Sequence, residues 1–149
     1  MGSYLNPGSE RFQTSLRSEI YVDKTMLISQ VNRRIRTEQK FLCVSRPRRF
    51  GKSMAADMLS AYYNCGADTS ALFENLKIAS AESYKEHLNQ YHVIKINMQE
   101  FLSAAHSVDE MLARLKRYIS FDLLEQYKNV RFRDENDFIQ VMKDIFAKT

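Results

Sequence analysis

The sequence predicts an α/β domain in which helices flank a parallel sheet. Its 149 residues are 44% hydrophobic and 27% charged, a balance typical of a compact domain rather than a disordered chain. Two short apolar runs, at residues 41–44 and 92–97, have the composition of buried strands. Segments with helical spacing alternate with them, which is the order expected of a parallel sheet. Since only two strands are evident, we expect the sheet to be incomplete toward the C-terminus.

The first half of the chain contains the clearer strand-to-helix junction. Residues 23–36 have apolar side chains at helical spacing, and Asp23 is a candidate N-cap. Residues 41–44 form an apolar run bounded by charged residues, as expected of a strand buried on both faces. After a short connection, helical spacing returns over residues 52–63. The sequence therefore predicts a strand, a tight turn and a helix in close succession.

The second half predicts helices around one further strand. Residues 70–76 and 80–90 have the pattern of short helices, each led by a serine that can cap the first N–H groups. The second strand follows at 92–97, and the pattern S-x-x-E then begins a long amphipathic helix over 107–127. A last helix is predicted at 136–147. No repeat or flexible linker divides these elements, so we expect a single domain.

Composition excludes several function classes. No apolar run approaches the roughly 20 residues that cross a bilayer, and the polar start has no signal-peptide core, so we expect a cytoplasmic protein without a membrane partner. Cys43 and Cys65 lack C-x-x-C spacing and are interpreted as reduced structural thiols. The three histidines have no ligand-like spacing, which gives a zinc site little support.

Basic residues are concentrated in one stretch. The window from residue 33 to residue 52 carries a formal charge of +7, so the remainder carries −3 against the net +4 of the chain. Such a local field requires an anionic partner or a solvated surface. The basic residues of this window are Arg33, Arg34, Arg36, Lys40, Arg46, Arg48, Arg49 and Lys52.

The junction after residue 44 resembles a phosphate-binding loop. In such a loop, N–H groups at a helix start face phosphate oxygens, a lysine reaches the β and γ phosphates, and a serine hydroxyl holds Mg²⁺. Gly51, Lys52 and Ser53 stand at those places, between a predicted strand and a predicted helix. The strict Walker A pattern G-x-x-x-x-G-K-[ST] fails, because its first glycine is Arg46. The context favours nucleotide binding over an ordinary strand-to-helix turn.

Three segments of the sequence together resemble the bacterial AAA-ATPase-like domain family. They are Y-V-D-K-T at residues 21–25, V-S-R-P-R-R-F-G-K-S at 44–53 and V-I-K-I-N at 93–97. The resemblance covers essentially the whole chain and implies a P-loop NTPase-like sheet that binds ATP with Mg²⁺. In that family an Arg-Pro pair replaces the first glycine of the loop. The candidate nucleotide-binding residues are Arg46, Pro47, Arg48, Arg49, Phe50, Gly51, Lys52, Ser53 and Met54, with Ser53 as the metal ligand.

The resemblance also implies what the sequence lacks. Family members follow the last helix with an apolar strand ending in acidic residues, L-I-D-E-x-D, the Walker B element that organises Mg²⁺ and the attacking water. This sequence has no such segment, and Asn97 and Glu100 are poor substitutes. We therefore expect the N-terminal part of such a domain, with little or no hydrolysis and no assigned catalytic residue. Many relatives also carry a C-terminal nuclease-like domain, a possible further partner.

Several of these residues have alternative interpretations. Arg46, Arg48 and Arg49 are phosphate clamps or ordinary surface arginines. Phe50 packs the loop onto the domain or belongs to a nucleic-acid surface. Met54, Met58 and the pair Tyr62 and Tyr63 have the spacing of a core stripe, and residues 21–25 approach a nucleotide or, as we favour, form a strand end and helix cap.

Two functions from different classes are consistent with the sequence. The first is an ATP-binding P-loop domain of an AAA-like hydrolase, in which Lys52 neutralises phosphates and Ser53 holds Mg²⁺. A lysine at a helix start opposes the helix dipole unless an anion lies there, which favours this function. The alternative is a nucleic-acid-binding module that uses the basic window from Arg33 to Lys52, whose affinity would fall steeply with salt.

Overall fold

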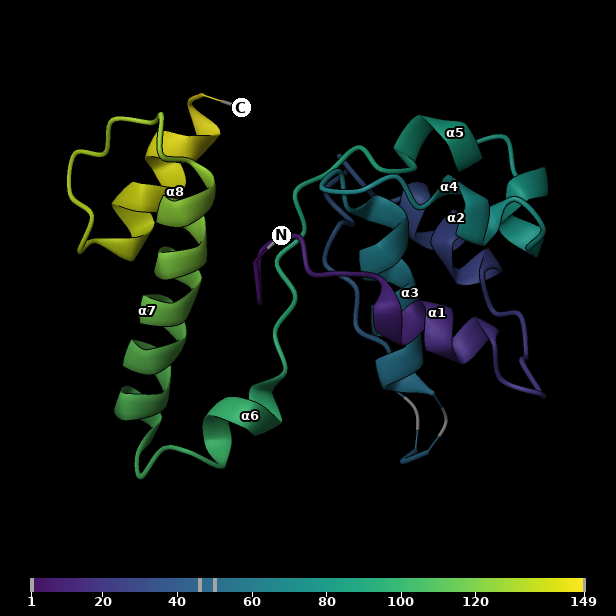
Figure 1. Cartoon of the computed structure of the whole chain (residues 1–149), viewed down its shortest axis with the longest axis horizontal. Coiled ribbons are helices and arrows are strands. Elements are labelled where there is room, and N and C mark those ends of the chain that lie inside the picture. The colour runs from purple at the N-terminus through teal and green to yellow at the C-terminus, as the bar shows by residue number, and fades with distance from the viewer. Residues whose placement is uncertain (1, 46, 50, 149) are drawn as a thin grey trace. The chain divides into compact units, whose positions relative to one another are not determined.

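The computed structural model describes residues 2–45, 47–49 and 51–148 (Figure 1). Contacts divide the chain into two compact units. The first, here called the α3 unit, is Asn6–Val93, and the second, the α7 unit, combines Met1–Leu5 with Ile94–Thr149. Within the described residues no helix is both long enough and apolar enough to cross a membrane.

Both units are built from helices. In its described residues the α3 unit contains five α-helices and one 3₁₀ helix: α1 (Glu10–Leu16), α2 (Met26–Asn32), α3 (Lys52–Tyr63), α4 (Ser70–Phe73), η1 (Lys77–Ser80) and α5 (Tyr84–His87). The α7 unit contains α6 (Met98–Leu102), α7 (Val108–Gln126) and α8 (Phe138–Phe146).

The predicted parallel sheet is wrong. Over the described residues the structure has no sheet, and its extended pairing is limited to two isolated bridges, Leu5 with Ile94 and Asn64 with Tyr91. Residues 41–45 are exposed and irregular, and Phe41 is 87% exposed. A strand requires a neighbour to satisfy its N–H and C=O groups, and apolar composition supplies none. Residues 92–97 pair with the distant N-terminal segment over a single bridge, through bonds such as that from the Lys95 N–H to the Tyr4 carbonyl at 2.9 Å.

The prediction of helix α3 is confirmed at both ends. The helix spans Lys52–Tyr63 and buries Met58, Tyr62 and Tyr63, so these members of the predicted core stripe pack inward. The prediction is wrong for Met54, which is 46% exposed in the first turn. It ends where Asn64 turns to an extended conformation, and the Asn64 side chain donates to the Pro7 carbonyl at 2.9 Å. A local hydrophobic pattern with a clear stop is sufficient to specify such a helix.

Aromatic rings form the centre of the α3 unit. Phe12 of α1 stacks on Phe73 at 5.1 Å, and Tyr62 of α3 meets Phe73 edge-on at 5.4 Å between ring centroids. α1, absent from the sequence prediction, lies against α3 (Figure 1). These contacts hold α3 beside α1.

The α7 unit is organised by two capped helices. The Ser107 hydroxyl accepts the Glu110 N–H at 3.1 Å, as the S-x-x-E pattern predicts, although the Glu110 carboxylate accepts from His106 rather than from Ser107. Asp137 caps α8 by accepting from Ile139 at 2.9 Å. The two helices then bury a shared core with the N-terminal segment, formed by Leu5, Ile119, Leu123, Val141 and Ile145.

Other predicted helices are present but shorter. Only Met26–Asn32 of the predicted 23–36 helix is helical, and its N-cap position is Thr25 rather than Asp23. Of the predicted helix at 70–76 only α4 is helical, and of that predicted at 80–90 the α-helical part is α5. The helices α1, α6 and η1 were not predicted. Helices this short depend on tertiary packing, so sequence periodicity defines them poorly.

Candidate functional site

The start of α3 has a backbone conformation that lets a ligand approach the main chain closely. Gly51 precedes the helix in the left-handed region, with φ at 78°, and Arg49 before it is also left-handed, with φ at 66°. Glycine adopts this conformation without the Cβ clash that other residues meet. The Gly51 carbonyl accepts the Ala55 N–H at 2.9 Å and closes the first turn of α3. The turn therefore enters a regular helix directly.

This helix start has the electrostatics of an anion site. Among the described residues no side chain caps it, and its first turn contains no acidic residue. The first N–H groups of a helix carry roughly half a positive charge and bind anions readily. Lys52 and Ser53 are exposed in this turn, so both side chains are accessible to an anion from solvent.

A third cation reaches the same place from a distant segment. The Lys24 Nζ atom lies 3.7 Å from the position that a Cβ on Gly51 would occupy. Lys24 and Arg49 also line a pocket of about 210 Å³ beside the helix start. The fold thus brings Lys24 and Arg49 to the glycine that Lys52 follows, although Lys24 and Lys52 are 28 positions apart in the sequence.

The pocket continues away from these cations into an apolar region. Phe12 of α1, Tyr21 of the segment before α2, and Met54 and Met58 of α3 contribute to its walls. Burial, together with the Asp23 carboxylate, raises the pKa of Tyr21, which keeps its hydroxyl neutral. The site is therefore cationic at the helix start and uncharged beyond it.

Asp23 and Thr25 hold the segment that carries Lys24. The Asp23 Oδ1 atom accepts from the Thr25 N–H at 2.8 Å and hydroxyl at 2.6 Å, while its Oδ2 accepts from the Lys77 N–H at 2.8 Å. Thr25 is fully buried, and its Oγ1 accepts the Ile78 N–H at 3.2 Å. Burial opposes ionisation of Asp23, but these hydrogen bonds outweigh it and hold the pKa of the carboxyl below its ordinary value.

The predicted site residues occupy distinct positions. Gly51, Lys52 and Ser53 form the helix start, while Arg49 and Met54 also line the pocket. Pro47 and Arg48 are exposed in the preceding turn. The predictions for Arg46 and Phe50 lie outside the described residues. The sequence analysis favoured a strand end and helix cap for residues 21–25 over an approach to a nucleotide, and did not single out Lys24, which lies beside Gly51.

Ser53 provides a partial fit to a magnesium ion. Its hydroxyl is exposed in the first turn of α3, and serine oxygen is a ligand that Mg²⁺ accepts alongside phosphate oxygens. No group of three or more His, Cys, Asp or Glu side chains that could hold a metal occurs among the described residues. The residues present thus fit an ion held mainly by phosphates, with Ser53 supplying one oxygen.

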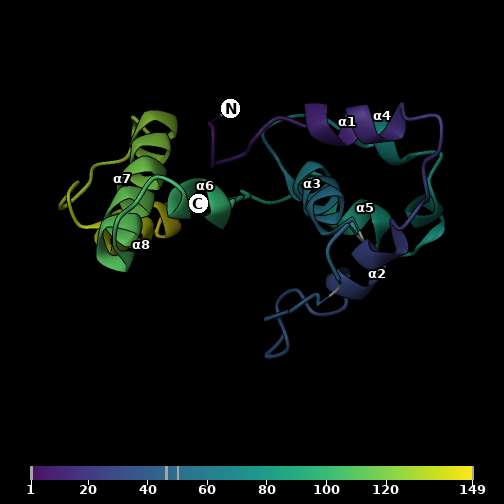
Figure 2. The ribbon, with the colours of Figure 1, turned by 90° about the horizontal axis from the view of Figure 1, so that it is seen from below.

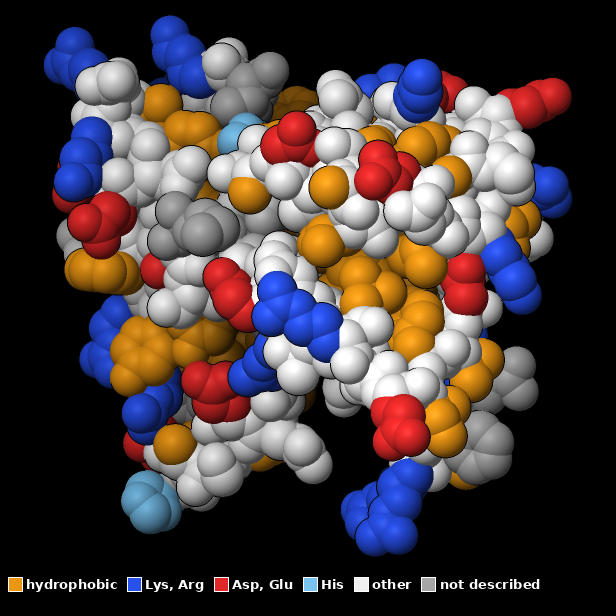
Figure 3. Space-filling view, turned by 45° about the vertical axis from the view of Figure 1, so that its right-hand side comes forward, with side chains coloured by type: hydrophobic (Ala, Val, Ile, Leu, Met, Phe, Trp, Pro, Cys, Tyr) orange, Lys and Arg blue, Asp and Glu red, His pale blue; other side chains and the backbone are white. Residues whose placement is uncertain are grey.

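The basic window extends away from the helices. Six of its seven described basic residues are exposed, and the segment between α2 and α3 runs outward in Figure 2. Lys40 lies over the ring of Phe41 at 5.6 Å, and Arg36 lies over Tyr91 at 5.8 Å. Figure 3 shows exposed hydrophobic side chains beside Lys and Arg side chains on one face of the molecule.

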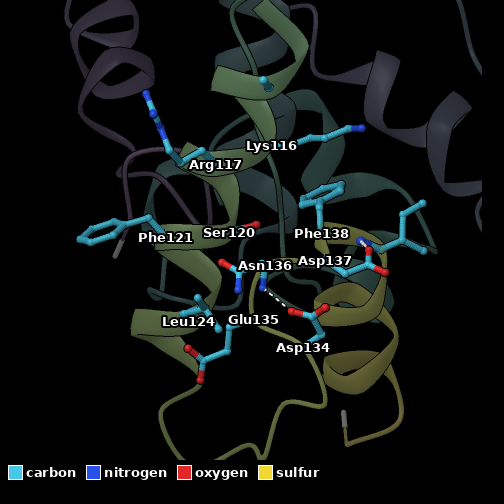
Figure 4. Close-up of a pocket in the computed structure, with 12 residues that line it drawn as sticks. Lys116, Arg117, Ser120, Phe121, Leu124, Asp134, Glu135, Asn136, Asp137 and Phe138 are labelled. Atoms are coloured by element: carbon cyan, nitrogen blue, oxygen red, sulfur yellow. Dashed lines mark hydrogen bonds between the residues drawn. The ribbon is translucent and has the colours of Figure 1, made fainter. Parts of the chain in front are cut away.

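A larger pocket in the α7 unit has a different character (Figure 4). It has a volume of about 750 Å³ and lies between α7 and the segment leading into α8. Lys116 and Arg117 line one side, whereas Asp134, Glu135 and Asp137 line the other. The carboxylates of Asp134 and Asp137 accept nearby backbone N–H groups. Three acidic side chains make this pocket a poor phosphate site.

Comparison with known proteins identifies one family. The sequence model of the AAA-ATPase-like family, described as predicted AAA-ATPase, matches residues 8–149. No curated protein and no solved structure matches the chain. The matched region includes all of α1 to α8 and hence every residue of the helix start and its pocket.

Proposed function

Because this chain belongs to the predicted AAA-ATPase family, we propose that the start of α3 binds the phosphates of ATP. The observation that carries the proposal is that Lys24 and Arg49 lie beside Gly51, at a helix start whose first residue is Lys52 and which no described side chain caps. Three cations around exposed N–H groups favour a polyanion over a singly charged ligand.

Each residue has a role that follows from its position. The N–H groups of the first turn bind phosphate oxygens, and Lys52 neutralises the terminal phosphates. Ser53 supplies one oxygen ligand to a Mg²⁺ ion that the phosphates also hold. Lys24 and Arg49 flank Gly51 and balance the remaining negative charge.

We propose binding with little or no hydrolysis. No Asp or Glu lines the pocket among the described residues, so no carboxylate there orients an attacking water. The proposed activity of this chain is therefore nucleotide binding. The ATPase activity that the family description suggests is not part of the function proposed for this chain.

Thermal unfolding with and without Mg²⁺-ATP tests this function. Ligand at a hundred times its Kd stabilises the folded state by about 2.7 kcal/mol, which for a chain of this size raises Tm by roughly 5–10 °C. We expect that rise in the parent protein and in Lys116→Ala, which removes an exposed lysine from α7. In Lys52→Ala the rise should disappear.

The unliganded variants separate loss of binding from loss of folding. Removing a cation from a helix start relieves an unfavourable dipole interaction of about 0.3–1 kcal/mol. Lys52→Ala should therefore unfold at the parent's temperature or slightly above it when no ATP is present. An equal ATP-induced rise in Lys52→Ala and the parent would overturn the proposed site.

Exposure of the basic window favours a second candidate function, nucleic-acid binding. Phe41 is 87% exposed beside Lys40, and exposed aromatic and cationic side chains together bind single strands. The affinity for a single-stranded oligonucleotide should then fall as salt is added. For each phosphate that the protein neutralises, a tenfold rise in salt concentration should lower the logarithm of the binding constant by about 0.7. Lys40→Glu with Phe41→Ala should abolish that affinity while leaving the ATP-induced rise in Tm unchanged, because neither residue lines the pocket.

A further inference from the structure

We propose that the pocket beside α7 is the interface of a two-fold dimer, in which a second copy of this chain covers it. The pocket lies between α7 and the segment leading into α8, within the α7 unit, and has a volume of about 750 Å³. Its walls combine basic, acidic and apolar side chains, so a molecule that covers it has to match all three.

Large apolar side chains are exposed at this pocket. Phe121 of α7 is 65% exposed and Ile139 of α8 is 59% exposed, and both line the pocket. In the view of Figure 4, Phe121 and Phe138 lie between the basic side chains and the acidic ones. Exposed apolar side chains bordered by charges are typical of a surface that another protein covers.

The charged side chains of the pocket are not paired with each other. Lys116 and Arg117 of α7 are exposed, and so are the three acidic side chains, Asp134, Glu135 and Asp137. In the described part of the chain no ion pair joins the basic side to the acidic side. Both sides are therefore open to the charges of a partner.

A second copy of the chain is complementary to this arrangement. Consider a two-fold axis through the middle of the pocket, in the plane of the surface and perpendicular to the line from the basic side to the acidic side. Rotation about it places the basic side of each copy against the acidic side of the other, and the apolar side chains of both copies at the centre.

Other partners match the pocket less well. A nucleic acid would meet three carboxylates, and like charges placed together oppose association. A protein surface of one charge would pair with one side of the pocket and repel the other. Only a surface that carries both charges in the opposite order satisfies both sides, and a two-fold copy presents that order without further requirement.

Sedimentation velocity over a range of protein concentrations tests the dimer. An interface built around one pocket is small, so we expect a dissociation constant on the order of tens of micromolar. Phe121→Ser should weaken dimerisation at least about tenfold, because the symmetry removes this apolar contact from both copies. Phe41→Ser changes a phenylalanine that is 87% exposed in the α3 unit, and as a matched control it should leave the dissociation constant unchanged.

Charge reversal tests the pairing of the two sides. Arg117→Glu and Glu135→Arg should each weaken dimerisation about tenfold, since each places like charges together at both symmetric contacts. An equimolar mixture of the two variants should restore the affinity of the parent protein. In the mixed dimer, Glu at position 117 of one copy meets Arg at position 135 of the other, and the unchanged Arg117 and Glu135 meet at the second contact.

Three outcomes would overturn the proposed interface. The first is a parent protein that stays monomeric far above the expected dissociation constant. The second is a mixture of the charge-reversed variants that associates no more tightly than either variant alone. The third is an equal loss of dimerisation in Phe121→Ser and Phe41→Ser, which would indicate association through any exposed phenylalanine.

Discussion

The carboxylate of Asp23 accepts the backbone N–H of Lys77 at 2.8 Å, and this bond ties the segment lining the pocket to the start of η1. Lys24 follows Asp23 directly and extends to Gly51. The position of a cation at the candidate site thus depends on a hydrogen bond to a residue 54 positions further along the chain.

Replacing Asp23 by Asn should destabilise the protein. Asn keeps one acceptor oxygen but places an NH₂ group where Oδ2 now receives the Lys77 N–H, so one bond is lost. We expect a loss of about 1–2 kcal/mol in the free energy of unfolding, measured by urea denaturation. Glu19→Gln makes the same charge change at an exposed position and should cost less than about 0.5 kcal/mol. Equal losses in the two variants would contradict the structural role of Asp23.

Substitutions of Gly51 should rank by their tolerance of a positive φ. Gly51→Ala should cost about 1–2 kcal/mol, because φ is 78°. Of the atoms in the described part of the chain, a Cβ there would meet only Lys24 Nζ, at an ordinary 3.7 Å, so the cost arises from the backbone. Gly51→Asn should cost less, since Asn enters the left-handed region more readily. Denaturant midpoints measure the order, and an equal loss for Ala and Asn would count against a left-handed Gly51.

The variant Tyr63→Phe should show how much one buried hydrogen bond contributes to the free energy of unfolding. The Tyr63 hydroxyl donates to Asn32 Oδ1 at 2.6 Å, and Asn32 is 6% exposed. Removing the hydroxyl leaves that oxygen without this donor, at a cost of about 1–3 kcal/mol in guanidinium denaturation. Tyr118→Phe, on the partly exposed side of α7, should cost less than about 0.5 kcal/mol. A Tyr63→Phe variant as stable as the parent protein would contradict this hydrogen bond.

The same residue predicts an alkaline loss of stability. Burial raises the pKa of Tyr63, and the neighbouring Tyr62 and Tyr91 add to the effect. The folded protein therefore keeps this phenol neutral at a pH where the unfolded chain, with a pKa near 10, releases the proton. Stability should fall as the pH rises above about 10, and Tyr63→Phe should make that fall shallower.

Asp144 predicts an acid loss of stability in the α7 unit. The Arg133 N–H donates to Asp144 Oδ2 at 2.8 Å and, with Gln140 donating to Oδ1, holds the pKa of this carboxyl below its ordinary value despite burial. A lowered folded pKa contributes stability above about pH 4 that is lost as the pH falls through the folded value. The stability difference between parent and Asp144→Asn should be large at pH 7 and shrink at pH 3. A difference of the same size at both pH values would refute this role.

The longer helices were the part of the fold most accessible from sequence, whereas the bounds of the short ones were not. Lys52–Tyr63 and the Ser107 cap of α7 match their predictions, because helical hydrogen bonds and caps join residues three to four positions apart. Such information is local and is visible in spacing. The predicted strand at 41–44 was wrong for the opposite reason, since strand formation depends on a partner that no local pattern specifies.

The candidate site shows the same division. The sequence by itself determined the family, the helix that begins at Lys52, and the concentration of positive charge before it. The tertiary structure alone decided that Lys24 reaches Gly51 and that Tyr21 and Phe12 form a pocket next to it. These placements depend on the packing of α1 against α3 and on the bond between Asp23 and Lys77. Contacts between residues far apart in the chain arise from packing in three dimensions, which helical periodicity does not encode.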